Sequence, residues 1–170
     1  NIKNILVSFS KDINRVALKS VPCIQTVYPN SNIIIVSNSK IIYRKYNRLK
    51  NIKILSNISG KRMRNLMLTS DLSVAAGGIT LYELASVGVP TIAVITNSNQ
   101  VDDTIGFSRQ KIIINSGHWN SRMFQKKLLK SLENIQSYEI RKQMSRKGQK
   151  TIDGLGAIRI AKFIKKKNKS

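Results

Sequence analysis

The stretch LSVAAGGITLYELASVGVPTIAVI, Leu72 to Ile95, decides the fold predicted for this chain. Its first residues, Leu72 to Ala75, form a short apolar run typical of a buried strand, and Thr91 to Ile95 form another. Between them, Thr80 to Val87 predicts a helix that begins after two glycines and ends at a Gly-Val-Pro turn, Gly88 to Pro90. A strand, a helix and a second strand in this order predict a βαβ unit with parallel strands.

The same alternation continues on both sides of this unit. Four more strands are expected, at Ile5–Phe9, Ile33–Val36, Ile52–Leu55 and Ile112–Ile114. Helices are expected at Ile13–Val27, Ile41–Leu49 and Arg62–Thr69, and from Ser121 onward with breaks near Ser137 and Gly148–Gly154. The strands are almost wholly apolar, as in sheets covered on both faces. We therefore expect an α/β fold, a Rossmann-like parallel sheet of about six strands with helices on both faces, which binds ligands at the carboxyl ends of its strands.

The composition bounds the possible functions. The 170 residues suit one domain, expected over residues 1–164 with a frayed basic tail over 165–170. No apolar run approaches the roughly 20 residues that span a membrane, and no signal peptide is recognisable. The first residue is not Met, so a fragment or a processed chain is expected. A single cysteine, Cys23, allows no internal disulfide and suits a reducing cytoplasm, so a cytoplasmic location is expected.

The charge is strongly positive, with 30 Lys and Arg against 8 Asp and Glu and a net charge of +22. Such a field attracts polyanions, so weak association with a membrane surface or another polyanion is one interpretation. The other is codon bias, because the abundant residues Ile, Lys and Asn share codons rich in adenine and thymine. No specific nucleic acid is expected as a partner.

The glycines before the predicted helix indicate an anion site. Gly77 and Gly78 permit a sharp turn and close approach of a ligand to the backbone. The helix start adds free N–H donors and the positive end of the dipole, which suits phosphate or pyrophosphate. Thr80 to Glu83 has the spacing of a capping box, so a tight turn with an ordinary cap is the alternative. Glu83 either closes that box or accepts hydrogen bonds from sugar hydroxyls.

Three segments resemble a known family. SDLSVAAGGITLYELASVGVPTIAVITNSNQ, Ser70 to Gln100, resembles the signature of the PseG/SpsG-like UDP-sugar hydrolases, which are related to the transferase MurG. NILVSFSKDINRVALKSV, Asn4 to Val21, resembles the start of that family's second domain. MSRKGQKTIDGLGAIRIAKFI, Met144 to Ile164, resembles its end and carries the same DG-GA pattern. The resemblance implies the carboxyl-terminal, nucleotide-sugar-binding half of a GT-B fold.

The resemblance also implies site residues. The diphosphate of UDP would contact Gly77, Gly78, Ile79 and Thr80, and Glu83 would hold the ribose hydroxyls. The sugar or its phosphate would contact Asn99, Gln100 and Ser8, and the uracil would lie against the loop containing Ile58, Ser59 and Met63. The implied partners are UDP or a UDP-sugar and an amino-terminal GT-B domain of the same protein. No metal and no cofactor are implied.

One departure concerns the first loop, where the family usually carries two glycines. Here the stretch is Ser8-Phe9-Ser10-Lys11-Asp12, so either Lys11 replaces backbone donors with its side chain or the loop has lost its role. The catalytic base is not identified. It is expected as a histidine of the amino-terminal domain, so this chain alone is expected to be inactive. His118, the sole histidine, is expected in a surface loop, where stacking on Trp119 is one arrangement.

Other polar and aromatic residues have ordinary structural interpretations. Asp102 and Asp103 suit the first turn of a helix, although they are also placed to act on a sugar. Cys23 is expected to be buried in the first helix. Tyr28, Tyr43 and Tyr46 lie among basic residues and are expected to pack, with stacking on RNA bases as the alternative.

The predicted function is therefore UDP-sugar binding within a UDP-sugar hydrolase of nonulosonic acid or surface polysaccharide synthesis. The donor-binding domain of a MurG-like glycosyltransferase is the first alternative. A basic nucleic-acid-binding module is the second.

Overall fold

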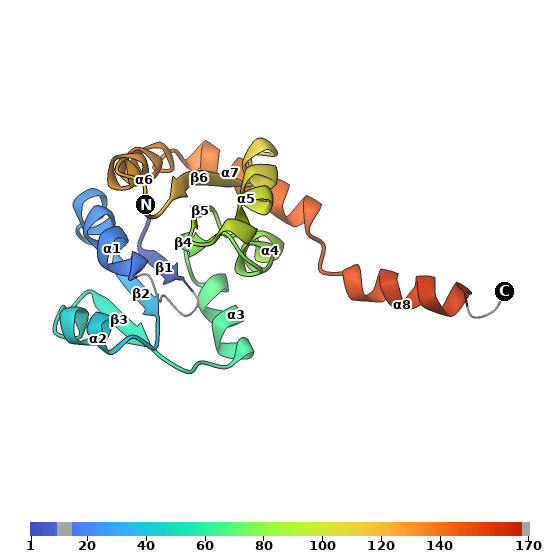
Figure 1. Ribbon diagram of the computed structural model, residues 1–170, viewed down its shortest axis with the longest axis horizontal. Helices are drawn as coiled ribbons and strands as arrows, with labels where there is room; N and C mark the ends of the chain where they lie inside the picture. The colour runs from blue at the N-terminus through green and yellow to red at the C-terminus, as the bar shows by residue number, and fades with distance from the viewer. Residues whose placement is uncertain (10–14, 168–170) are drawn as a thin grey trace.

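The computed structural model describes residues 1–9 and 15–167. Six parallel strands form one sheet in the order β3-β2-β1-β4-β5-β6 (Figure 1). The strands are β1 (Asn4–Ser8), β2 (Asn32–Val36), β3 (Ile52–Leu55), β4 (Leu72–Ala76), β5 (Thr91–Ile95) and β6 (Ile113–His118). The helices are α1 (Val16–Val27), α2 (Lys40–Tyr46), α3 (Gly60–Leu68), α4 (Thr80–Val87), η1 (Ser98–Gln100), α5 (Val101–Arg109), α6 (Phe124–Asn134), α7 (Tyr138–Thr151) and α8 (Gly156–Lys167). The predicted α/β fold is confirmed.

Alternate strand residues face opposite sides of the sheet, and helices cover both sides. On one face, Val7 and Val74 pack in a large core with residues of α1, α2 and α6. On the other, Leu6 and Ala75 pack with residues of α3 and α4, and Ala93 packs with α4 and α5. Both cores are apolar, which explains why the strands read as nearly continuous apolar runs.

The strand order creates a switch point between β1 and β4. The chain runs from β1 outward through β2 to β3 and then returns, so that β4 pairs with the free side of β1. Successive crossovers then leave the sheet in opposite directions at the carboxyl ends of β1 and β4. In open sheets of this kind, ligands bind at such a point. The turn after β4 is the one that carries Gly77 and Gly78.

Several predicted boundaries differ from the structure. The break expected near Gly148–Gly154 is present but shorter, because α7 runs through Gly148 to Thr151 and α8 begins at Gly156. A Cβ at Gly148 would lie 2.9 Å from the Ala85 carbonyl oxygen, so the glycine serves close packing of α7 on α4. Strand β6 extends to His118, beyond the predicted Ile114. Of the basic tail expected over 165–170, Lys165 to Lys167 continue helix α8, and residues 168–170 lie outside the described residues.

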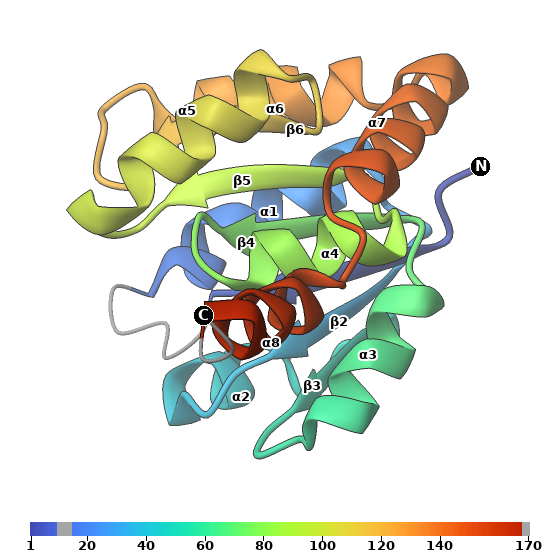
Figure 2. The ribbon, with the colours of Figure 1, turned by 90° about the vertical axis from the view of Figure 1, so that its right-hand side faces the viewer.

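Helix α8 projects away from the rest of the molecule in Figure 1, and in Figure 2 it lies in front of the other elements, toward the viewer. None of its residues is buried. Across the described ranges, 1–9 and 15–167, no helix is both long and apolar enough to cross a membrane.

Candidate functional site

The turn from β4 to α4 leaves three backbone donors together. The Gly77 N–H donates to the Val94 carbonyl oxygen at 3.1 Å, which extends the sheet pairing by one residue. The next bonded N–H is that of Leu81, which donates to Gly78 O at 2.9 Å. Within residues 1–9 and 15–167, the N–H groups of Gly78, Ile79 and Thr80 have no acceptor. Three free donors at the start of an eight-residue helix suit a phosphate group.

Gly77 is required by packing, and its N–H is already used. A Cβ at this position would overlap the Thr104 hydroxyl and lie 3.2 Å from Gln100 Cβ. Thr104 is fully buried, and its hydroxyl donates to the Gln100 carbonyl oxygen at 2.6 Å. At Gly78 the nearest atom to a Cβ would be Gln100 Nε2, at 3.7 Å, so this side of the turn is open. The turn thus rests against the start of α5.

The predicted capping box does not form. A cap residue has extended backbone, whereas Ile79, the residue before the helix, has helical angles of φ −51° and ψ −33°. Thr80 is already the first helical residue, and no side chain of the described residues caps α4. The Glu83 carboxylate therefore has no role in capping. It also has no hydrogen-bond or ion-pair partner in the part of the chain that the structure describes.

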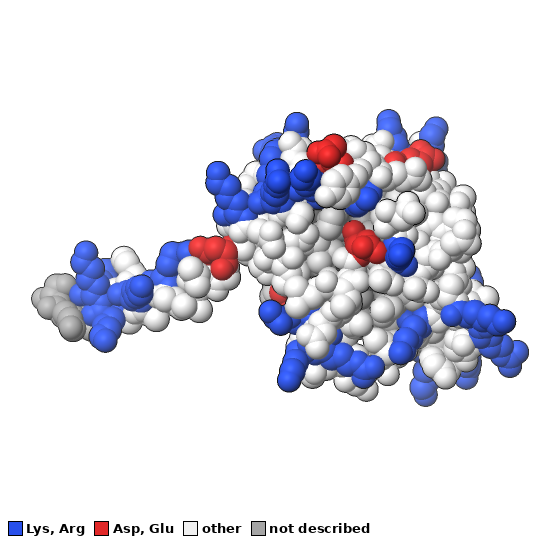
Figure 3. Space-filling model, turned by 180° about the vertical axis from the view of Figure 1, so that it is seen from behind, with Lys and Arg blue, Asp and Glu red and all other residues white. Residues whose placement is uncertain are grey.

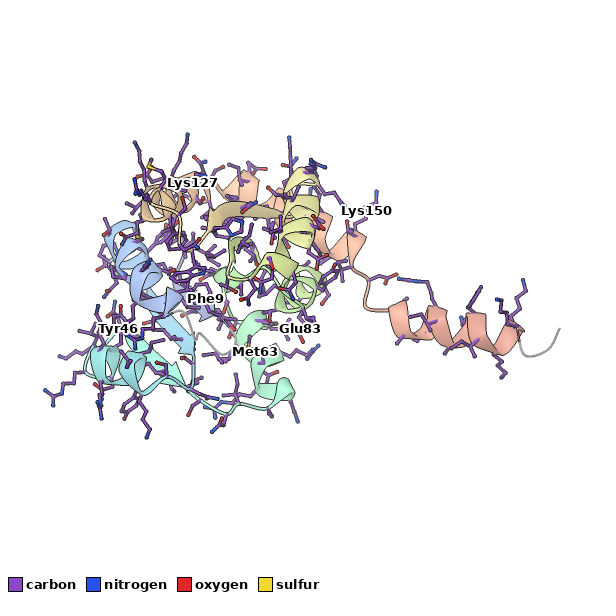
Figure 4. The ribbon with its side chains drawn as sticks, in the orientation of Figure 1. Phe9, Tyr46, Met63, Glu83, Lys127 and Lys150 are labelled. Carbon is purple, nitrogen blue, oxygen red and sulfur yellow. The ribbon has the colours of Figure 1, made fainter. Side chains whose placement is uncertain are left out.

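Glu83 lines an open groove of about 430 Å³ between α3 and α4. Figure 4 shows Glu83 and Met63 on neighbouring helices at this place. The other lining residues are Gly60, Arg64, Met67, Ser86 and Val87. The structure therefore brings together the predicted ribose residue and one predicted uracil residue.

The remaining residues of the predicted uracil loop have other positions. Ser59 caps α3, because its hydroxyl accepts the Arg62 N–H at 3.3 Å. Ile58 is half-buried, and neither residue lines the groove. Arg64 and Ser86 were not predicted as site residues, because neither belongs to a sequence motif. They line the groove because of their positions on helices α3 and α4.

Gln100 is held in one orientation beside the glycine turn. The Thr96 backbone N–H donates to Gln100 Oε1 at 2.9 Å, and the Thr96 hydroxyl lies 3.1 Å from the same oxygen. A backbone N–H can only donate, so the atom facing Thr96 must be the amide oxygen. The Gln100 NH₂ group is consequently directed toward Gly78. Asn99, its predicted companion, is exposed on η1.

The acidic pair after Gln100 has a structural role. Asp102 and Asp103 lie in the first turn of α5, as predicted. The Tyr82 hydroxyl donates to Asp103 Oδ1 at 2.9 Å, and this hydrogen bond is the main cause that raises the pKa of Tyr82. The Tyr82 ring meets Phe107 edge-on, with centroids 4.8 Å apart. These contacts join α4 to α5 and keep the glycine turn in place.

Ser8 is the predicted site residue at the start of the loop that follows β1. Ser8 is buried at the end of β1 and pairs in register with Ala75 of β4, so it lies next to the strand that leads into the turn. Ser10 and Lys11 of this loop lie outside the described residues.

The structural interpretations of several other residues are confirmed in whole or in part. His118 is exposed, as expected, but it is the last residue of strand β6 and not part of a loop. Trp119 lies under the Lys19 ammonium, which is 4.8 Å from the ring centre. Cys23 is buried in α1, and burial raises the pKa of its thiol. Tyr28 and Tyr46 pack in or against the core.

Tyr43 was also expected to pack, but its side chain is exposed.

Among the described residues, no group of three His, Cys, Asp or Glu side chains lies close enough together to hold a metal ion.

Comparisons with known proteins agree with this fold, because solved structures that share it are found for more than nine tenths of the chain. In sequence, the chain is 26% identical over 102 residues to the spore coat polysaccharide biosynthesis protein SpsG of Bacillus subtilis (strain 168). That match covers 60% of this chain and 30% of the SpsG protein. No family model matches.

Solved structures share the fold at low sequence identity. The S. aureus MnaA–UDP co-structure has a TM-score of 0.76 and 15% identity, over 96% of this chain and 46% of that one. A putative UDP-N-acetylglucosamine 2-epimerase from Listeria monocytogenes has a TM-score of 0.74 and 15% identity, over 99% and 46%. The rhamnosyltransferase SpnG complexed with thymidine diphosphate has a TM-score of 0.72 and 14% identity, over 90% and 42%. The chain thus spans less than half the length of each.

Proposed function

We propose that this chain binds the UDP part of a UDP-sugar at the carboxyl end of β4. The observation that carries the proposal is the Glu83 carboxylate, one turn inside a helix whose first N–H groups, like this carboxylate, have no partner among the described residues. Phosphate oxygens require donors and ribose hydroxyls require an acceptor, and the site offers both within one helical turn. Two fold neighbours, MnaA with UDP and SpnG with thymidine diphosphate, are solved with bound nucleoside diphosphates, which supports the same ligand class here.

The proposed ligand spans two parts of the site. The diphosphate accepts hydrogen bonds from the N–H groups of Gly78, Ile79 and Thr80, and the Gln100 amide adds a donor on the same side. The ribose lies against Glu83, and the uracil enters the groove beside Met63. Asn99 and Ser8 are proposed to reach the sugar or its phosphate.

The proposed reaction is hydrolysis of a UDP-sugar in surface polysaccharide or nonulosonic acid synthesis. Water attacks the anomeric carbon, the bond from that carbon to the β-phosphate oxygen breaks, and UDP departs. The residues of this chain stabilise the charge on the departing diphosphate. The base that takes the proton from water is proposed to lie on an amino-terminal domain. SpsG, the relative from spore coat polysaccharide biosynthesis, supports the setting.

A MurG-like glycosyltransferase is the alternative activity, because SpnG is a rhamnosyltransferase with the same fold. In that reaction an acceptor hydroxyl takes the place of water, while the role of this domain is unchanged. We propose a cytoplasmic location for either activity.

Calorimetry with UDP at moderate salt tests the proposal. The wild-type chain should bind UDP with micromolar affinity. Glu83→Ala removes hydrogen bonds to a charged acceptor worth about 1.5–3 kcal/mol, so affinity should fall roughly 10- to 150-fold. Glu133→Ala, an exposed glutamate on α6 at the other face of the sheet, should bind like the wild type.

A nucleic-acid-binding module predicts the opposite result, with no affinity for UDP and tight binding to RNA that weakens steeply with salt. The isolated chain should also leave a UDP-sugar intact. Release of UDP by this chain alone would show that it carries its own base.

A further inference from the structure

The groove between α3 and α4 holds polar groups to which the proposed phosphate and ribose contacts assign no role. Met63 and Met67 supply apolar lining from α3, with Met67 buried and Met63 half-buried. Besides Glu83, the polar side chains of the groove are Arg64 on α3 and Ser86 on α4. An apolar lining with a few placed polar groups is the usual form of a small-molecule site.

The Ser86 hydroxyl can only accept a hydrogen bond from a ligand. It donates its own hydrogen to the Glu83 carbonyl oxygen, at 2.8 Å, one turn back along α4. A hydroxyl has one hydrogen and two lone pairs, so the oxygen keeps its capacity as an acceptor. A ligand atom that meets Ser86 must therefore be an N–H or O–H donor.

The Arg64 guanidinium is available as a donor. Across residues 1–9 and 15–167 it has no hydrogen-bond or ion-pair partner, and it forms no ion pair with the Glu83 carboxylate that lines the same groove. A guanidinium carries several N–H donors and no acceptor. A ligand atom that meets Arg64 must therefore accept, as a carbonyl oxygen does.

The groove lies where the base of the proposed ligand would reach. Helices α3 and α4 both begin at the carboxyl edge of the sheet, after β3 and β4, and cover the same face. From Ile79, which is proposed to hold phosphate, to Ser86 the distance along the helix axis is about 10 Å. Glu83, proposed for the ribose, lies between them. The order of phosphate, ribose and base in a nucleotide thus matches the order of these groups along α4.

We propose that Arg64 and Ser86 select the base of the nucleotide, and that the selected base is uracil. This inference rests on the proposed binding of UDP. In uracil the N3–H group stands between two carbonyl oxygens, so Ser86 accepts from N3–H while Arg64 donates to a neighbouring oxygen. In cytosine N3 carries no hydrogen, so two acceptors would face each other at Ser86. The flexible methionine side chains pack against the ring.

The general charge of the protein does not distinguish one base from another. Figure 3 shows blue Lys and Arg side chains at many places on one face of the molecule, with fewer red carboxylates. A net charge of +22 attracts UDP and CDP alike, because both carry the same diphosphate. A preference between these two ligands therefore reports the hydrogen-bonding groups of the groove.

Calorimetry of the full chain with UDP, CDP and inorganic pyrophosphate tests the inference. The wild-type chain should bind UDP about tenfold more tightly than CDP, because CDP leaves polar groups of the groove unpaired. Arg64→Met should weaken UDP binding about tenfold or more and leave pyrophosphate binding unchanged. The control variant Arg62→Met removes the same charge from the same helix outside the groove. It should bind UDP nearly like the wild type, since exposed charges at a distance are screened by salt.

Ser86→Ala removes the acceptor for N3–H. It should weaken UDP binding about 2- to 10-fold and leave CDP binding unchanged, so that the preference for UDP narrows. Arg64 is exposed and Ser86 is half-buried, so all three variants should melt at the wild-type temperature.

Failure of this inference can be told from failure of the proposed function. If the wild-type chain binds neither nucleotide, both fail. If it binds UDP and CDP equally, or if Arg64→Met binds UDP like Arg62→Met, UDP binding stands and the selection of the base by the groove is overturned. Equal losses of affinity for UDP and pyrophosphate in Arg64→Met would place Arg64 on the diphosphate, which also overturns it.

Discussion

Replacement of Gly77 by alanine should destabilise the fold, whereas the same change at Gly78 should not. An alanine Cβ at position 77 would overlap the hydroxyl of the fully buried Thr104 and press on Gln100 Cβ at 3.2 Å. Overpacking of this kind costs about 1–3 kcal/mol, and partial loss of the Thr104–Gln100 hydrogen bond adds about 1 kcal/mol. The reduced freedom of the unfolded chain offsets about 0.4–1 kcal/mol.

The net loss is about 1–3.6 kcal/mol, which lowers the melting temperature by roughly 2–14 °C for a chain of this size. At Gly78 the new Cβ would lie 3.7 Å from Gln100 Nε2, an ordinary contact, and φ is not positive. Gly78→Ala should therefore melt like the wild type but bind UDP more weakly, since its methyl group stands among the free donors. Thermal unfolding followed by circular dichroism measures both variants. Equal melting temperatures for Gly77→Ala and the wild type would refute the packing argument.

Two further predictions concern side chains identified by their hydrogen bonds. Thr96→Val keeps the backbone N–H but removes the hydroxyl that donates to Gln100 Oε1. Calorimetry should therefore show that the affinity for UDP falls about 2- to 10-fold while the affinity for uridine is unchanged. The control variant Thr96→Ser, which keeps the hydroxyl, should bind UDP like the wild type. An equal loss for uridine would contradict a role in orienting the amide toward the diphosphate. The neutral phenol of Tyr28 donates to the Leu132 carbonyl oxygen, and burial raises the pKa of this phenol to about 12. The stabilisation from the neutral phenol is therefore complete below pH 10 and is lost as pH rises toward 12. Denaturant unfolding should therefore show the wild-type advantage over Tyr28→Phe shrinking between pH 10 and 12; a constant advantage would contradict this origin.

The sheet could be predicted from sequence because its strands are short, apolar and separated by helical segments. β3, α4 and β5 have the predicted bounds. Helix ends were less predictable, since they depend on tertiary contacts. Gly148 reads as a helix breaker by propensity, yet it lies within α7 because Ala85 of α4 leaves no space for a side chain.

The candidate site was predictable where one continuous motif builds it. Gly78, Ile79 and Thr80 are adjacent in sequence and present their N–H groups at one helix start. The spacing of Thr80 and Glu83 also suggested a capping box, and that alternative is wrong. A capping box requires the threonine to precede the helix, whereas Thr80 is the first residue of α4.

Other site residues were hidden by distance along the chain. Thr96 and Thr104 act on Gln100 through a loop geometry that no motif encodes. Arg64 and Glu83 line the same groove only because α3 and α4 cover the same face of the sheet.

A titration of the ¹⁵N-labelled chain with UDP, followed by amide NMR, tests the central claim most directly. Binding at the β4–α4 turn should shift the amide signals of Gly78, Ile79 and Thr80 most strongly, because their N–H groups acquire acceptors. The Gln100 side-chain NH₂ signals should shift with them, while amides of α6 remain in place. Shifts confined to the lysine-rich helices, or none at millimolar UDP, would contradict the proposed site.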